Sequence, residues 1–114
     1  MVTEGLGRQK FHGKIAILVN ERSASASEMV AAFAAENGLA AIVGTKTAGR
    51  LMGASAFKVG FGYRVALPIA AYKTWQGKML EGIGVCPNIE VAFNPEAHVQ
   101  ANDPQLDAAA AALC

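Results

Sequence analysis

Two apolar runs, separated by one stretch of helical periodicity, constrain this fold more than any other feature. The first run, residues 15–19, reads Ile-Ala-Ile-Leu-Val, and the second, residues 39–43, reads Leu-Ala-Ala-Ile-Val. Short runs rich in β-branched residues are typical of strands that are buried on both faces of a parallel sheet. We therefore expect an interior first strand, a helix and a second parallel strand, joined by a right-handed crossover.

The connecting helix has recognisable ends. Ser25 and Glu28 form an S-x-x-E pattern, which predicts a capping box at the N-terminus, and Gly38 is a typical residue just past a C-terminus. Several apolar residues recur at helical spacing, and we expect them on the inward face of the helix: Met29, Val30, Phe33 and Ala34.

The pattern changes after residue 50. Residues 55–59 and 63–71 flank a Gly-Phe-Gly turn and predict a β-hairpin, with Pro68 favouring an edge or a bulge. A last short strand is expected at 89–93 and an alanine-rich helix at 105–113. A chain of 114 residues that is 53% hydrophobic can bury one core but not two. We expect one α/β domain over 1–114, a βαβ unit followed by antiparallel strands and a C-terminal helix.

Composition excludes several classes of function. The net charge of +1 comes from 10 basic and 9 acidic residues, so the chain has no basic stripe that would bind nucleic acid. No apolar run is long enough to span a bilayer, and residues 1–10 lack the apolar core of a signal peptide. Cys86 and Cys114 have no neighbouring ligands, so we expect no metal and no cofactor. Two free thiols are favoured over a disulfide.

The junction between the first strand and the helix has two interpretations. A serine hydroxyl at a helix N-terminus is well placed to attack a carbonyl, because the helix end stabilises a developing oxyanion. Ser25 could equally serve only as the N-cap. The loop over residues 44–50 mimics a phosphate-binding G-x-x-x-x-G-[KR] motif, but no Ser or Thr follows it and it leads into a strand, which disfavours phosphate binding.

Four blocks of this chain, at residues 13–20, 23–28, 42–49 and 80–91, together resemble the C-terminal processing peptidases, also called tail-specific proteases. The resemblance covers residues 13 to about 93, with the blocks in matching order and spacing. It implies a Clp protease/crotonase-like core fragment and hydrolysis of peptide bonds by a serine nucleophile. It also implies a partial catalytic domain, without the PDZ domain and upstream half that family members typically carry.

The resemblance places the nucleophile at Ser25 and a backbone oxyanion donor at Ala26. The catalytic lysine of the family falls on Arg50, whose guanidinium stays protonated and cannot accept the serine proton. Arg50 could instead be a solvated loop cation or bind a substrate carboxylate. Lys46 has the wrong offset from the serine to replace the base. Glu81 is a secondary candidate for the glutamate of tricorn-type relatives.

Three further positions depart from the family pattern. Ala54 stands where many members have a glutamine that supports the lysine, and Asn88 stands where the closing block usually has aspartate. Tricorn-type relatives use a histidine base drawn from the upstream half, and neither His12 nor His98 falls in a matching block.

Two functions follow as hypotheses. The first is a serine-type peptidase domain that is weak or inactive as this isolated chain. The alternative is a catalytically silent peptide-binding or assembly module that keeps the fold and presents an edge strand to a partner. In either case we expect a polypeptide partner and a homo-oligomer, because a core normally covered by a second half exposes apolar surface. The family is often exported or periplasmic, but the sequence leaves the location open.

Overall fold

A computed structural model describes residues 11–99 and 102–114, except for the side chains at 98 and 99. Residues 1–10, where the sequence predicts no signal peptide, lie outside the described residues.

The central sheet has three parallel strands in the order β1 (Ala16–Val19), β2 (Ala41–Gly44) and β5 (Ile89–Glu90). This confirms the parallel βαβ unit. The expected interior position of the first strand is wrong, because β1 lies at the edge of the described sheet and its Leu18 is 45% exposed. The last strand is also shorter than the predicted 89–93. Just before it, Asn88 is bonded to Ile42 of β2: the Asn88 Oδ1 accepts from the Ile42 N–H, and the Asn88 N–H donates to the Ile42 carbonyl oxygen.

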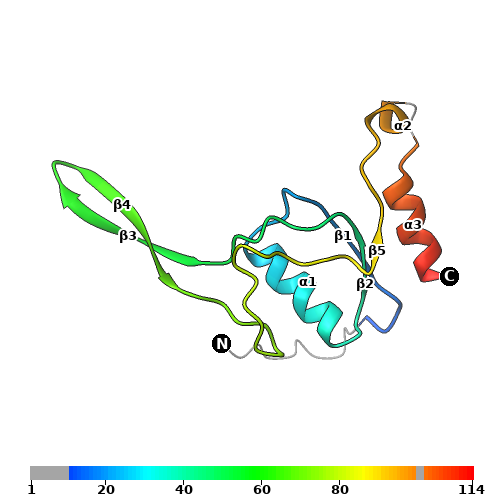
Figure 1. Ribbon diagram of the computed structural model, residues 1–114, viewed down its shortest axis with the longest axis horizontal. Helices are drawn as coiled ribbons and strands as arrows, with labels where there is room; N and C mark the ends of the chain where they lie inside the picture. The colour runs from blue at the N-terminus through cyan, green and yellow to red at the C-terminus, as the bar shows by residue number, and fades with distance from the viewer. Residues whose placement is uncertain (1–10, 100–101) are drawn as a thin grey trace.

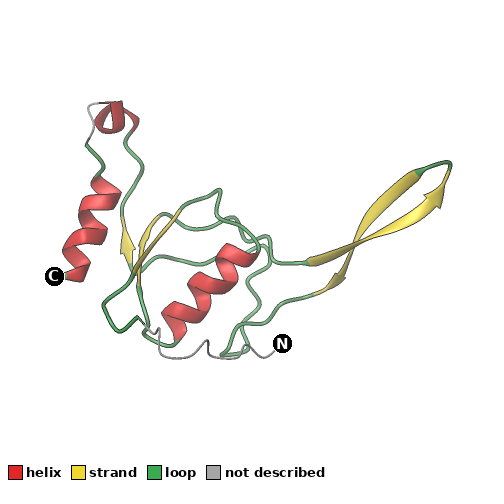
Figure 2. Ribbon diagram, turned by 180° about the vertical axis from the view of Figure 1, so that it is seen from behind, coloured by secondary structure: helices red, strands yellow, loops and turns green. Residues whose placement is uncertain are grey.

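Two helices cover the sheet from opposite sides, α1 (Ala26–Glu36) and α3 (Pro104–Leu113) (Figures 1 and 2). The predicted C-terminal helix is confirmed. The Asp103 carboxylate caps it by accepting from the backbone N–H groups of Gln105 and Leu106. A short helix that the sequence did not predict, α2 (Pro95–Val99), precedes it.

The inward face of α1 differs from the prediction. Its buried side chains are small, apart from one carboxylate: Glu28, Ala31, Ala32 and Ala34. Phe33 is 44% exposed and packs edge-on against Trp75, with ring centroids 6.2 Å apart. Alanines face inward because they let the helix approach the fully buried Ile42 and Val43 of β2. Spacing alone placed Phe33 on the wrong side.

The predicted hairpin is confirmed as β3 (Gly53–Gly60) and β4 (Tyr63–Ala70), an antiparallel pair that projects away from the rest of the molecule (Figure 1). The pairing becomes irregular between Gly53 and Ala54, opposite Pro68, as expected for a proline in a strand. The hairpin side chains are largely exposed, and Phe61 at the turn is 100% exposed. The hairpin therefore contributes little to the core.

The two cysteines, Cys86 and Cys114, are both free and exposed. Among the described residues, no helix combines the length and apolar character needed to cross a membrane.

Candidate active site

Ser25 has a strained backbone. Its φ is 57° and its ψ is −120°, a combination that a residue with a side chain rarely adopts. Ser25 is exposed and comes immediately before α1, in the connection that follows β1. Such strain costs on the order of 1–3 kcal/mol and is commonly found at functional sites. A serine on a strained strand-to-helix turn is also how hydrolases present a nucleophilic hydroxyl.

The loop after β2 returns to this turn. The Ser25 N–H donates to the Arg50 carbonyl oxygen at 2.9 Å, and the Ala48 N–H donates to the Ser23 carbonyl oxygen at 3.0 Å. The structure thus brings the backbone of residue 50 against the predicted nucleophile. Arg50 itself is exposed. Lys46 is exposed as well, and its spacing from Ser25 in the sequence argued against it as the base.

Ala26 begins α1, so its N–H has no acceptor within the helix. An N–H at that position adds to the positive end of the helix dipole, where negative charge is stabilised. The residue after the predicted nucleophile is therefore suited to hold an oxyanion.

Glu28 connects these parts, although it is fully buried. Its Oε1 accepts from the Thr47 hydroxyl at 2.5 Å and from the Gly49 N–H at 2.7 Å. Its Oε2 accepts from the Ser25 N–H at 3.0 Å and from the Arg50 N–H at 2.9 Å. One carboxylate therefore holds the turn at Ser25 and the loop that contains residue 50 together, using both of its oxygens.

The environment of Glu28 favours its charged form. Burial raises the pKa of this carboxyl, but the hydrogen bonds from Thr47, Arg50, Gly49 and Ser25 outweigh burial and leave the pKa below its ordinary value. Glu28 is thus a carboxylate at neutral pH, acting as acceptor for every donor that it meets.

A second loop, residues 80–85, packs against the residue 50 loop. The Thr47 Oγ1 accepts from the Val85 N–H at 2.7 Å while its hydroxyl hydrogen points to Glu28, and the Gly82 N–H donates to the Gly49 carbonyl oxygen at 2.8 Å. Glu81 lies in this second loop. Its Oε2 accepts from the N–H groups of Leu51 and Met52, at 2.5 and 2.9 Å.

Gly84 shows how closely the two loops approach. Its φ is +78°, and a Cβ placed there would lie 2.5 Å from the Thr47 carbonyl oxygen. Gly77 has a similar φ of +79° but no atom within 4 Å of its added Cβ, which makes it a matched control. We expect Gly77→Ala to cost about 1–2 kcal/mol, for backbone conformation alone. Gly84→Ala should cost at least about 2 kcal/mol more, because a backbone contact must move. Urea denaturation measures both, and equal midpoints would contradict the close approach.

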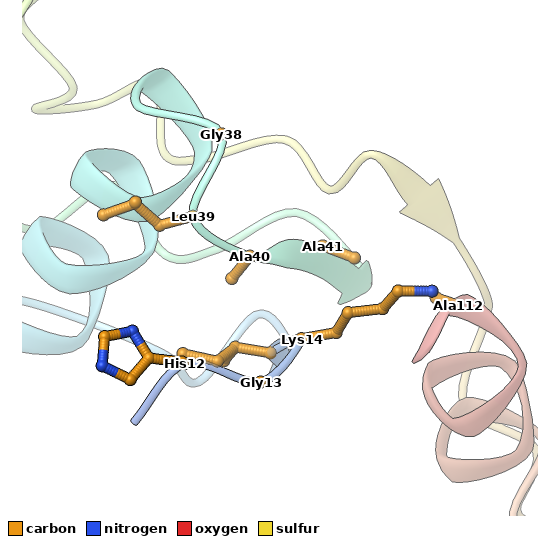
Figure 3. Close-up of a pocket in the computed structure, with 9 residues that line it drawn as sticks. His12, Gly13, Lys14, Gly38, Leu39, Ala40, Ala41 and Ala112 are labelled. Carbon is orange, nitrogen blue, oxygen red and sulfur yellow. The ribbon is translucent and has the colours of Figure 1, made fainter. Parts of the chain in front are cut away.

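Two cavities can be compared as ligand sites. A groove of about 240 Å³ opens beside Ser25, with apolar walls that include Met29, Leu51, Met52 and Tyr72. Figure 3 shows a larger one, of about 350 Å³, lined by residues 12–15, 38–41 and Ala112. That pocket lies where the parallel strands begin, and there the Lys14 Nζ donates to the Cys114 carbonyl oxygen at 2.8 Å. Ligands of open α/β sheets bind at the carboxyl ends of the strands, which favours the groove beside Ser25.

Comparison with known proteins identifies this arrangement. The family model of peptidase family S41 matches residues 2–91. This chain belongs to peptidase family S41.

Relatives in sequence and in structure agree with that assignment. The S41 chain is 36% identical to a carboxyl-terminal-processing protease of Synechocystis over 81 residues, which is 71% of this chain and 19% of the relative. It is 33% identical to tricorn protease homolog 1 of Streptomyces coelicolor, over 87% of this chain and 10% of the relative. The crystal structure of the tricorn protease superimposes with a TM-score of 0.80 at 28% identity, over 89% of this chain and 10% of that one.

These matches confirm two predictions, the C-terminal processing peptidase resemblance and the Clp protease/crotonase-like α/β fold. The chain is a serine-type S41 peptidase domain by family. It spans about one-fifth or less of the length of the relatives described above.

The S-x-x-E pattern does not predict the main role of Glu28. It predicts a capping box, and the N–H of Ser25 does donate to the Glu28 carboxylate. A signal for burial was present, because Glu28, Ala31 and Ala32 are spaced i, i+3 and i+4 and share one helix face. Thr47 was not singled out at all. Its partners lie 19 and 38 residues away, a separation that no local pattern reports.

Three other positions were compared with the family pattern: Ala54, His12 and His98. Ala54 pairs with Pro68 in the exposed hairpin, and His12 is exposed at the start of the described chain. His98 falls in α2, and its side chain is among those not described.

Proposed function

We propose that this S41 domain, residues 1–114, carries the nucleophile half of a peptide-hydrolysing site, with Ser25 as the nucleophile. The observation that carries this proposal is the strained backbone of Ser25 at the N-terminus of α1, held against the backbone of residue 50. A strained backbone conformation persists only where several surrounding contacts hold it in place. Here two loops and the buried Glu28 carboxylate hold Ser25.

The chemistry would be acyl transfer. The Ser25 Oγ attacks the scissile carbonyl, its proton passes to a base, and the carbonyl oxygen becomes an oxyanion near the Ala26 N–H. The groove beside Ser25 has apolar walls, so it suits an apolar side chain of a polypeptide substrate.

Arg50 limits this chemistry, because a guanidinium cannot take the serine proton at ordinary pH. We therefore propose that the isolated chain hydrolyses unfolded polypeptides negligibly. The same residue favours the second candidate function, a silent peptide-binding or assembly module. The edge of β1 that pairs with no other described strand, and the exposed hairpin, would then contact a polypeptide partner or further copies of this chain.

Restoring a lysine separates the two candidates. We expect Arg50→Lys to increase labelling of Ser25 by a fluorophosphonate at least about tenfold, because a positioned base accelerates attack by the hydroxyl. The position is exposed, so the labelling rate should rise with pH towards about 10, where a lysine becomes neutral and able to accept a proton. The parent chain should show no such rise.

The controls are Ser25→Ala, which should abolish labelling, and Arg64→Lys, the same exchange on the exposed hairpin. Labelling of Arg50→Lys no faster than that of Ser25→Ala would reject the nucleophile and support the silent module.

A further inference from the structure

The backbone on either side of residue 50 makes an unusual set of hydrogen bonds. Four consecutive N–H groups, at residues 49 to 52, all donate to carboxylates. Glu28 of α1 accepts the first two, and Glu81 of the second loop accepts the last two. Hydrogen bonds to charged acceptors are about twice as strong as neutral ones.

We propose that Glu28 and Glu81 form a carboxylate clamp that positions residue 50 opposite Ser25. The clamp consists of these two carboxylates and the N–H groups of residues 49–52. In this arrangement Glu81 is a positioning residue that acts on the site through the backbone. The importance of Glu81 for a reaction rests on the proposed function. The effect of Glu81 on the position of the residue 50 backbone does not.

The two carboxylates are anchored differently. Glu28 is fully buried and is also bonded to Thr47 and Ser25, so it belongs to the core of the site. Glu81 is only half-buried and holds both of its partners with a single oxygen, Oε2. Between them the chain turns into the core, because Leu51 is 5% exposed whereas Arg50 and Met52 are exposed.

The clamp holds only backbone atoms of residue 50. Its N–H is bonded to Glu28 and its carbonyl oxygen to the Ser25 N–H, while neither bond involves the guanidinium. The position of this backbone therefore does not depend on whether residue 50 is arginine or lysine. This explains how the loop can keep its geometry beside Ser25 although the residue type departs from the family pattern.

Amide hydrogen exchange and amide chemical shifts test the clamp in the full chain without requiring activity. Glu81→Ala removes the Oε2 that accepts from both N–H groups, so exchange at Leu51 and Met52 should accelerate at least about tenfold, as for amides that lose their hydrogen bond. The Ser25 amide resonance should also shift, although the Glu81 carboxylate accepts from residues 51 and 52 rather than from Ser25. Exchange at Ile42 should stay unchanged, and Glu90→Ala, at an exposed glutamate of β5, should change none of these signals.

Glu81→Gln is the conservative variant. One amide oxygen can replace Oε2 and accept from both N–H groups, so protection and the Ser25 resonance should largely return. Unchanged exchange at Leu51 and Met52 in Glu81→Ala, or an unchanged Ser25 resonance, would overturn the positioning role.

Labelling in the Arg50→Lys background separates this proposal from the proposed function. If the lysine variant is labelled, adding Glu81→Ala should slow labelling at least about tenfold and Glu81→Gln should restore most of it. Labelling unaffected by Glu81→Ala would count against the clamp. If no variant is labelled, the nucleophile proposal fails, whereas the exchange and resonance data still accept or reject the clamp.

Discussion

Glu28→Gln should lower the free energy of unfolding by about 3–5 kcal/mol. The substitution keeps the shape of the side chain but replaces one acceptor oxygen by an NH₂ group. Because each oxygen of Glu28 accepts from two donors, the NH₂ must face either Thr47 and Gly49 or Ser25 and Arg50. Two donors then lose their bond to the carboxylate and face the NH₂ group instead, and of these four donors the Ser25 N–H keeps a second acceptor, the Arg50 carbonyl oxygen. Chemical denaturation followed by circular dichroism measures the loss.

Glu96→Gln, at an exposed glutamate in the first turn of α2, is the matched control and should change stability by less than about 0.5 kcal/mol. If Glu28→Gln does not fold, Thr47→Val tests the same network more gently. It removes one hydroxyl that donates to Glu28 and accepts from Val85, with an expected cost of about 1–3 kcal/mol. Parent-like midpoints for both variants would show that the buried carboxylate does not hold the site together.

The same carboxylate makes stability depend on pH. The folded pKa of Glu28 is lower than the unfolded one, so its contribution is complete above the ordinary glutamate value of about 4.3. The contribution declines as the pH falls below that value towards the folded pKa, because the unfolded state then binds the proton more readily. The parent should therefore lose more stability than Glu28→Gln between neutral pH and acid. Parallel pH profiles for the two would contradict the assignment.

Ile42→Ala should cost about 2–5 kcal/mol, whereas Phe33→Ala should cost only about 1–2 kcal/mol. Ile42 is fully buried at the centre of the sheet, so its truncation leaves a cavity beneath α1. Phe33 is 44% exposed, and its ring contact is with Trp75, which is itself 74% exposed. The order of the two effects tests which face of α1 packs on the sheet.

Urea midpoints rank the two variants directly, with Val59→Ala on the projecting hairpin as an exposed control that should stay near the parent. A larger loss for Phe33→Ala than for Ile42→Ala would mean that the aromatic side chain belongs to the core, as the spacing in the sequence suggested.

Patterns within a few residues predicted most of the secondary structure. Apolar β-branched runs gave β1 and β2, the S-x-x-E pattern and Gly38 gave the ends of α1, and the Gly-Phe-Gly turn gave the hairpin. These features are local, because a cap, a positive φ or a strand preference depends on adjacent residues. The blocks at 13–91 also sufficed to recognise the family.

Burial was predicted less well. The sequence of β1 is typical of an interior strand, yet β1 lies at the edge of the described sheet, and Phe33 was assigned to the wrong face of α1. Hydrophobicity indicates that a side chain is suited to a core, but the packing partners decide which face is covered. Here α1 lies close to β2, and close approach selects alanines over a phenylalanine.

By itself, therefore, the sequence determined the local elements, the family and the position of Ser25 at the start of a helix. Only the tertiary structure decided that Glu28, Thr47, Glu81 and the residue 50 loop meet around that serine. A glutamate three residues after a serine looks the same whether it only caps a helix or also binds a distant loop. Which of the two it does depends on the donors that folding brings to the carboxylate, and those at Thr47, Gly49 and Arg50 lie 19 to 22 residues along the chain.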